Sequence, residues 1–319
     1  MKITVLDTAT MGQDTPFEKL SELGEVVLYD ETPPELIKDR IADSEVVITN
    51  KIKITDDIMA AARHLRLICV FATGYDNVDV SSAAKRGIGV CNVPGYSTDS
   101  VVLFTVATVL ALASHLREYD RSVRSGEYTQ CARANILTPS FHEISGKTWG
   151  IVGFGNIGRA VARVAEALGA RVIVNKRTPV ADYPCVDISV LAAESDIITV
   201  HCPLNNETRN LIDARVIDMM KYNAILVNEA RGAVLDESAV AHAVLNGRIS
   251  AFGCDVYSEE PFSEDHPYNE IKELDNVILT PHAAWSAYEA RVRCIETIVR
   301  NVRSSLFEGG TLNRVDKLI

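Results

Sequence analysis

The sequence predicts an α/β protein with two doubly wound parallel-sheet domains. Three observations lead to this prediction. The chain has 319 residues, about twice the length of a typical single domain. Short β-branched runs alternate with helical stretches in two separate parts of the chain. A glycine-rich turn opens the second part, between a strand and an amphipathic helix.

In the first part, five runs are apolar on both faces, as strands of a covered parallel sheet are. They are MKITVLD, GEVVLYD, SEVVITN, LRLICVF and IGVCNVP. Helical stretches are expected between them, at 16–23, 34–41, 56–62 and 81–86.

The alternation then stops. Residues 97–125 contain no Gly or Pro and are predicted to form one long, largely apolar helix. Its most apolar segment, 101–113, is too short to span a bilayer. Residues 127–141 are expected to be irregular.

The second alternation contains six expected strands, and a long amphipathic helix is expected at about 287–308. The strands are TWGIVGF, RVIVNK, DIITVHCP, AILVNEA, ISAFGCDVY and NVILTPH. Six strands behind a glycine-rich first turn are the layout of a dinucleotide-binding sheet.

Composition and charge exclude several classes of protein. The net charge is −11, with no basic stripe that would bind a nucleic-acid backbone. The N-terminus lacks the pattern of a signal peptide. The seven cysteines are scattered and form no CxxC pair, so neither a disulfide framework nor a zinc site is expected. We therefore expect a cytosolic protein without a metal, a membrane or a nucleic-acid partner.

The glycine-rich turn has the spacing GxGxxG, with Asn156 and Ile157 between the last two glycines. Gly153 would make the tight turn, and Gly155 would let the backbone approach a diphosphate. Gly158 would let the helix pack on the strand. The diphosphate would then lie at the positive end of the helix. A purely structural turn is the alternative, and the flanking strand and helix argue against it.

An acid that binds the adenosine ribose is usual about twenty residues after such a turn, and this chain has none there. The second strand instead ends in Asn175, Lys176, Arg177 and Thr178. The two cations could neutralise a 2′-phosphate, with Asn175 and Thr178 as donors. NADP(H) is thus slightly favoured over NAD(H); the alternative is that these cations are simply solvated.

Three ionisable residues follow predicted strands of the second sheet. Arg231 lies in NEARGAVLDE, Glu260 in DVYSEEP and His282 in LTPHAAW. Ligands of open α/β sheets bind at the carboxyl ends of the strands. Each residue alone has a bland alternative, as a turn arginine, a solvated acid or a loop histidine. Their combination behind a dinucleotide turn indicates a catalytic site.

Over essentially its whole length the chain resembles the D-isomer-specific 2-hydroxyacid dehydrogenase family. The matching stretches are FATGYDNVDV, GFGNIGRAVARVAEALGARV, TVHCPLNNETRNLID, NEARGAVLDE, DVYSEEP and TPHAAW. The resemblance implies a flavodoxin-like substrate domain, made of residues 1–97 and 288–319. It also implies a Rossmann dinucleotide-binding domain, 98–287, and a homodimer formed largely through the long helix after Ser97.

The resemblance further implies hydride transfer between NAD(P)H and a small 2-oxo acid, giving a D-2-hydroxy acid. Arg231 would bind the substrate carboxylate and polarise the 2-oxo oxygen. His282 would protonate that oxygen, and Glu260 would fix the imidazole tautomer and favour its protonated form.

Further contacts follow from the same resemblance. Backbone amides around Thr73, Gly74 and Tyr75 would hold the substrate carboxylate. Asp255 would contact the nicotinamide carboxamide. The cofactor groove would be lined by Cys202, Pro203, Thr208, Ala230 and His282.

Residues 48–51 (ITNK) together with TPHAAW are similar to glycerate dehydrogenases, which are also called hydroxypyruvate reductases. Lys51 would attract a polar or anionic substrate group, or is a plain surface lysine. Trp285 would shield the reacting centre from water, or packs at a hinge. Leu103 and Phe104 stand where many relatives have an acid or an amide, which weakens assignment of the substrate by analogy.

Three classes of function therefore remain to be compared. The leading one is a hydroxypyruvate or glyoxylate reductase, with a broad-specificity D-2-hydroxyacid dehydrogenase for lactate-like or bulkier acids as the alternative. A dinucleotide-sensing, corepressor-like binding protein would need partner-binding tails, which the sequence lacks. A vestigial enzyme would have lost at least one of Arg231, Glu260 and His282.

Overall fold

The computed structural model describes residues 1–316, which fold into two compact units. The first unit contains Met1–Ser97 and the chain from Ser286 onward, and the second contains Thr98–Trp285. The boundary expected from the sequence, after residue 287, lies two residues later than the observed one. Residues 317–319 of the expected substrate domain lie outside the described residues.

The first unit is built on a five-stranded parallel sheet in the order β2-β1-β3-β4-β5. This is the flavodoxin-like order, as expected from the sequence. The five expected strands are all present, as β1 (Lys2–Val5), β2 (Glu25–Leu28), β3 (Val46–Thr49), β4 (Leu67–Val70) and β5 (Gly89–Cys91).

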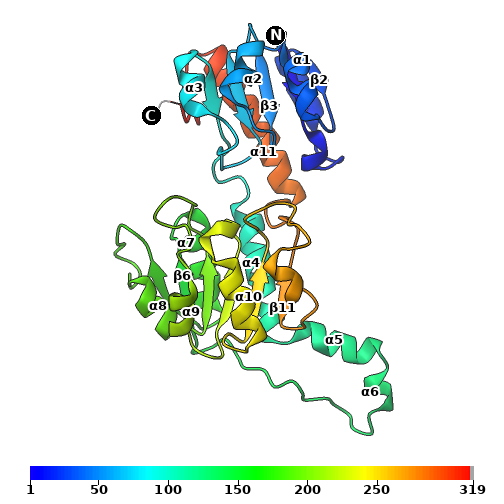
Figure 1. Ribbon diagram of the computed structural model, residues 1–319, viewed down its shortest axis with the longest axis vertical. Coiled ribbons are helices and arrows are strands. Elements are labelled where there is room, and N and C mark those ends of the chain that lie inside the picture. The colour runs from blue at the N-terminus through cyan, green and yellow to red at the C-terminus, as the bar shows by residue number, and fades with distance from the viewer. Residues whose placement is uncertain (317–319) are drawn as a thin grey trace. The chain divides into compact units, whose positions relative to one another are not determined.

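Helices cover this sheet because its central strands are apolar on both faces. The C-terminal helix α11 (Tyr288–Leu306) packs against β4 and against the 3-10 helix η2 (Phe17–Leu23), which joins two distant parts of the chain in one unit (Figure 1). The remaining helical segments are short: η1 (Thr8–Met11), η3 (Pro34–Leu36), α1 (Ile37–Ile41), α2 (Asp56–Ala61) and α3 (Val80–Lys85).

The second unit contains a six-stranded parallel sheet in the order β11-β10-β9-β8-β6-β7. Its strands are the six expected ones: β6 (Thr148–Val152), β7 (Arg171–Asn175), β8 (Ile197–Val200), β9 (Ile225–Asn228), β10 (Ala251–Cys254) and β11 (Val277–Leu279). A single residue, Cys185, adds a parallel bridge to Val174 on β7. Counting that bridge as a reduced third strand gives the Rossmann order 3-2-1-4-5-6, extended by β11.

Two helical layers enclose this second sheet (Figure 1). One face packs against α4 (Thr98–Ala113) and α7 (Asn156–Ala167). The other packs against α8 (Ile188–Glu194), α9 (Ala214–Met219) and α10 (Glu237–Leu245). Two 3-10 turns, η4 (Gly232–Val234) and η5 (Pro267–Glu270), follow β9 and β10. Because all pairings in this sheet are parallel, every strand of the unit ends at the same edge.

The prediction of one long helix over residues 97–125 is wrong. α4 ends at Ala113, and α5 (Leu116–Arg124) continues at an angle of 64°. His115 takes the left-handed conformation between them, with φ of 52°, and the Ser114 hydroxyl donates to the Leu110 carbonyl at 2.7 Å. The sequence carries no Gly or Pro at this break, because a single non-glycine residue in that conformation costs only about 1–2 kcal/mol.

Beyond the break the chain leaves the sheet. α5, the single turn α6 (Glu127–Gln130) and the irregular segment 131–143 extend as an arm away from the rest of the unit (Figure 1). Among the described residues no single helix is long and apolar enough to cross a membrane, although the bent pair α4 and α5 passes that test together.

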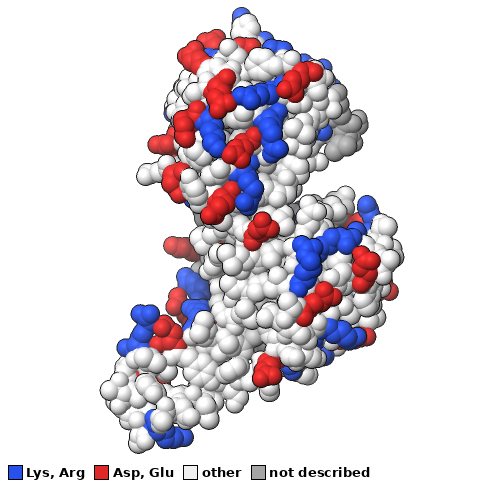
Figure 2. Space-filling model, turned by 180° about the vertical axis from the view of Figure 1, so that it is seen from behind, with Lys and Arg blue, Asp and Glu red and all other residues white. Residues whose placement is uncertain are grey.

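Charges of both signs are mixed on the protein surface. The face in Figure 2 shows acidic and basic side chains interspersed, without a continuous basic stripe. The seven cysteines are free, and five of them are buried.

Candidate active site

The glycine-rich turn after β6 has the geometry that the spacing predicts. Gly153 has a φ of +90°, and a Cβ there would lie 2.4 Å from the Cys202 nitrogen. A Cβ on Gly158 would lie 2.3 Å from the Gly153 carbonyl oxygen. A Cβ on Gly155 would meet nothing within 4 Å, and α7 begins at the next residue. An open backbone at a helix N-terminus is a fitting place for a diphosphate.

Two of the side chains at the end of β7, Asn175 and Arg177, already have partners within the protein. The Asn175 side-chain amide donates to the Val186 carbonyl at 2.9 Å and so fixes the segment that forms the Cys185 bridge. The Arg177 guanidinium is largely exposed and lies 3.7 Å from the Glu207 carboxylate. Lys176 is half-buried and Thr178 is exposed. Two cations are therefore near solvent at this strand end.

Three residues predicted to line the cofactor groove, Cys202, Pro203 and Thr208, lie on the loop after β8. Cys202 is buried, and burial raises the pKa of its thiol to about 11, so the thiol is neutral. The Thr208 hydroxyl donates to the Pro203 carbonyl at 2.6 Å. This bond closes the loop that follows the strand.

The imidazole of His282 pairs with the carboxylate of Glu260. Nδ1 of His282 lies 2.7 Å from Oε2 of Glu260. The backbone N–H of Tyr257 donates to the other carboxylate oxygen at 3.1 Å. A carboxylate facing Nδ1 keeps a proton on that nitrogen, so Nε2 is the atom at which a proton can be exchanged.

The turn that carries His282 is anchored by Asp255. Its carboxylate accepts hydrogen bonds from the Thr280 hydroxyl (2.6 Å) and from the N–H groups of Ala283 (2.8 Å) and Ala284 (2.9 Å). Burial raises the pKa of Asp255, and these donors oppose that shift. His282 itself has a left-handed backbone, with φ of 55°. Asp255 thus fixes the turn from which the imidazole projects.

Arg231 is positioned by the turn after β9. The buried Asn228 donates to the Arg231 carbonyl at 3.0 Å and accepts from the Ala230 N–H at 3.1 Å. A Cβ on Gly232 would lie 2.0 Å from the Tyr257 carbonyl carbon, so this turn lies directly on the loop that carries Glu260. The neighbouring strands β9, β10 and β11 therefore bring Arg231, Glu260 and His282 to one edge.

A pair of side chains that the sequence did not single out, Glu237 and His266, supports the Glu260 loop. Glu237, at the start of α10, accepts from the Ser258 N–H at 2.9 Å and from the Ser258 hydroxyl. Nε2 of the buried His266 lies 3.1 Å from the same carboxylate. His266 Nδ1 accepts from the Tyr268 N–H, so its proton is on Nε2 and points at Glu237. Only the tertiary contacts reveal this role, since an acid in a first helical turn is common.

The predicted substrate residues of the first unit follow β3 and β4, which are neighbours in its sheet. The buried carboxylate of Asp7, at the end of β1, accepts from the Lys51 N–H at 2.7 Å and from the Asn50 N–H at 2.9 Å. The Thr73 hydroxyl donates to the Val93 carbonyl at 2.9 Å. Gly74 and Tyr75, like Thr73, lie on the loop after β4. Trp285 is half-buried and is the last residue of the second unit.

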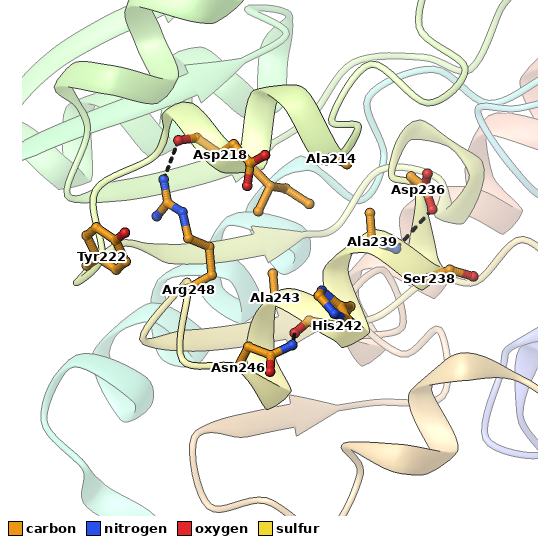
Figure 3. Close-up of a pocket in the computed structure, with 11 residues that line it drawn as sticks. Ala214, Asp218, Tyr222, Asp236, Ser238, Ala239, His242, Ala243, Asn246 and Arg248 are labelled. Atoms are coloured by element: carbon orange, nitrogen blue, oxygen red, sulfur yellow. Dashed lines mark hydrogen bonds between the residues drawn. The ribbon is translucent and has the colours of Figure 1, made fainter.

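A groove of about 520 Å³ lies elsewhere on the second unit, between α9 and α10 (Figure 3). Arg248 stacks over the Tyr222 ring there and donates to the Asp218 carbonyl. None of the predicted site residues lines it. Among residues 1–316 no cluster of three or more His, Cys, Asp or Glu side chains is arranged to hold a metal.

Comparison with known proteins identifies the class to which this architecture belongs. Residues 106–284 match the family model described as "D-isomer specific 2-hydroxyacid dehydrogenase, NAD binding domain". The chain belongs to the D-isomer-specific 2-hydroxyacid dehydrogenase family. It is therefore an oxidoreductase with an NAD-binding domain, as the resemblance implied.

The chain is also similar to individual proteins of known name or structure. The chain is 34% identical to a hydroxypyruvate reductase of Blautia hydrogenotrophica, over 99% of this chain and 100% of that one. It is similar in structure to a Sinorhizobium meliloti NADPH-dependent glyoxylate/hydroxypyruvate reductase solved with NADP and malonate, with 28% identity, a TM-score of 0.85, and coverage of 98% of this chain and 96% of that one. An acyclic imino acid reductase solved with NADPH and D-Arg has 31% identity and a TM-score of 0.88, over 99% and 100% of the two chains.

Replacement of Glu237 tests the support of the Glu260 loop. Glu237→Ala removes the acceptor for Ser258 and His266, and we expect kcat to fall roughly tenfold or more, since small displacements of catalytic groups are costly. Affinity for NAD(P)H should change little. Steady-state kinetics and cofactor titration measure the two effects, with the exposed Glu273→Gln as control. Wild-type kcat in Glu237→Ala would contradict the assignment.

Proposed function

We propose that the protein reduces hydroxypyruvate to the D-2-hydroxy acid, and glyoxylate to its hydroxy acid, using NADPH or NADH. The observation that carries the proposal is the 2.7 Å pair of His282 and Glu260, at the same sheet edge as Arg231 and in a unit with an open glycine-rich turn. The names of the Blautia and Sinorhizobium relatives support the choice of substrates.

In this proposal the substrate is held by charge and by backbone amides. Arg231 binds the carboxylate and polarises the 2-oxo oxygen, for which a planar guanidinium fork is suited. The amides around Thr73, Gly74 and Tyr75 hold the same carboxylate. Lys51 attracts the polar group at C3 of the substrate, and Trp285 excludes water.

The proton is supplied by His282 from Nε2, because Nδ1 faces Glu260. As that proton leaves, Glu260 keeps the remaining proton on Nδ1 and holds the ring in place. A nicotinamide bound at this edge would supply the hydride. In the reverse direction His282 Nε2 takes the proton back.

The cofactor residues follow from the same proposal. The turn of Gly153, Gly155 and Gly158, with Asn156 and Ile157, would hold the diphosphate. Cys202, Pro203, Thr208 and Ala230 line the groove, and Asp255 and His282 lie at the nicotinamide. We favour NADPH because Lys176 and Arg177, with Asn175 and Thr178, stand where an NAD-specific acid would be.

Two other substrate classes are outcomes of the same test. A broad-specificity D-2-hydroxyacid dehydrogenase would prefer lactate-like or bulkier acids. The likeness to an imino acid reductase adds imines of 2-oxo acids to the substrates to be tried. A sensor protein would bind the cofactor without turnover.

The first test follows absorbance at 340 nm with purified protein, NADPH or NADH, and hydroxypyruvate, glyoxylate, pyruvate or phenylpyruvate, or the imines of these acids. We expect the first two to be the best substrates. His282→Ala should lower kcat by roughly 10²–10⁴ with cofactor binding intact, as loss of a general acid does. His242→Ala, an exposed histidine of α10, should not. Cofactor binding without turnover of any 2-oxo acid or imine would favour a sensor.

The cofactor preference has its own test. Lys176→Asp with Arg177→Ala removes both cations and adds an acid for the ribose, so the ratio of kcat/KM for NADPH over NADH should fall roughly tenfold or more. Arg215→Ala, an exposed arginine outside the turn, serves as control. An unchanged ratio would show that these cations do not bind the 2′-phosphate.

We propose a homodimer formed by α4 and the arm. Large apolar side chains gather on these segments, each more than half exposed: Leu103, Leu116, Val123, Leu137 and Phe141. Sedimentation at micromolar concentration should show a dimer, and Leu103→Asp with Leu137→Asp should shift it toward monomer. Tyr222→Asp, at the groove between α9 and α10, should leave it intact. A wild-type monomer would refute the proposal.

We further propose a cytosolic location, which the free cysteines support. Cell fractionation checks it, and recovery in a membrane fraction would contradict it.

A further inference from the structure

A row of three ionisable side chains crosses the carboxyl edge of the second sheet. Val200 on β8 pairs with Asn228 on β9, and Asn228 pairs with Cys254 on β10. The residues that follow them are His201, Glu229 and Asp255, and the Asp255 N–H continues the ladder to the Asn228 carbonyl at 3.1 Å. The three are therefore lateral neighbours at this edge.

Two of these side chains, Glu229 and Asp255, also share one face of the sheet. Side chains alternate along a strand, so Glu229 points to the same side as Val227, and Asp255 to the same side as Gly253. Val227 belongs to the core under α4, and a Cβ on Gly253 would lie 2.4 Å from a Thr108 methyl on α4. Glu229 and Asp255 therefore lie together on the α4 side.

Two members of the row have buried polar atoms without partners. Oε2 of Glu229 and both ring nitrogens of His201 make no hydrogen bond to any group of residues 1–316, and Glu229 is only 8% exposed. Leaving a buried polar group unpaired costs about 1–3 kcal/mol. Asp255, by contrast, accepts three hydrogen bonds. The edge therefore holds unused hydrogen-bonding capacity beside a satisfied carboxylate.

Burial keeps the unpaired members neutral. Burial, and then the charge of Asp255, raise the pKa of Glu229 to about 9. Burial lowers the pKa of His201 to about 3. Burial raises the pKa of Asp255 as well, but its three donors favour the ionised form, so it ionises before Glu229. At neutral pH Glu229 is thus a carboxylic acid with an O–H donor.

The surroundings contain few other charges. α4 carries one charged residue, Asp99, which is exposed in its first turn. The Cys254 thiol is buried, and burial raises its pKa well above the usual value. The His282 charge lies close enough to lower the pKa of Asp255. No cation is among the residues that shift the pKa of Glu229.

A carboxylate next to a carboxylic acid is the complement of a primary amide. The carboxylate accepts from an amide N–H, and the acid donates to the amide oxygen. We propose that Glu229 is a cofactor-positioning residue: its O–H binds the carboxamide oxygen of nicotinamide, while Asp255 accepts from the carboxamide N–H. The inference rests on the proposed function, which brings a nicotinamide cofactor to this edge.

Equilibrium binding tests the inference. NADPH and 2′-phospho-ADP-ribose, which lacks the nicotinamide, are titrated against wild type, Glu229→Gln, Glu229→Leu and the exposed control Glu273→Gln by protein fluorescence. Glu229→Leu should lose NADPH affinity roughly tenfold, the worth of one hydrogen bond, and keep its affinity for 2′-phospho-ADP-ribose. Glu229→Gln keeps an N–H donor and should bind NADPH within about twofold of wild type.

The pH dependence gives a second readout, which does not depend on the Leu variant folding. As pH rises through about 9, Glu229 loses its proton, so wild-type affinity for NADPH should fall between pH 8 and 10. Glu229→Gln cannot ionise and should show a flat profile over that range.

Three results would overturn the inference. They are unchanged NADPH affinity in Glu229→Leu, an equal loss for 2′-phospho-ADP-ribose, and the same pH profile in wild type and Glu229→Gln. Failure of the proposed function is distinguishable, because it would appear as absent turnover of the 2-oxo acids, whereas the inference is measured by cofactor affinity alone.

Discussion

The parallel register of β8, β9, β10 and β11 is the constraint on which the rest of the second unit depends. Parallel pairing forces all carboxyl ends to one edge, and helices on both faces keep that edge as the open side. Arg231, Glu260 and His282 each follow a different strand, so only this register makes them neighbours. A slip of one residue would turn each strand's side chains to the opposite face.

Asp255 links this sheet to the turn that carries His282. It extends the backbone ladder of β10 and at the same time binds the turn that carries His282. Glu237 does the equivalent for the loop of Glu260, from α10. Asp255 is buried, the Glu237 side chain is only 9% exposed, and each accepts several donors, so the two carboxylates hold the loops of His282 and Glu260 in place. Loops that carry function are commonly fixed in this way by a rigid scaffold.

Burial at the same edge decides protonation states. His201 is neutral because burial disfavours its cation, and Glu229 keeps its proton because burial and Asp255 disfavour a second negative charge. Buried polar groups without partners are rare in folded proteins. Their concentration beside Asp255 therefore indicates a place where a ligand completes the hydrogen bonding.

The sequence by itself determined both sheets. All eleven strands were predictable, because most of them are apolar throughout and buried on both faces, although the edge strand β2 is exposed at both ends and half-buried between. The GxGxxG spacing follows directly from backbone sterics. The family was also predictable, since several matching segments stand in one order, and the pairing of Glu260 with His282 was expected from the same resemblance. The bend at His115 was not, because a single left-handed residue leaves no signal in composition.

Only the tertiary structure decided which ordinary residues matter. Glu237, His266 and Glu229 stand in no distinctive local pattern. Glu237 matters because it binds Ser258 and His266, which are 21 and 29 positions away. Glu229 matters because it lies beside Asp255, 26 positions away, and its Oε2 has no partner among residues 1–316. The Asn175 side-chain amide, which we propose as a cofactor donor, also donates to the Val186 carbonyl. Periodicity reports which face of an element is buried, whereas hydrogen-bond partners and desolvation depend on what another segment brings to that face.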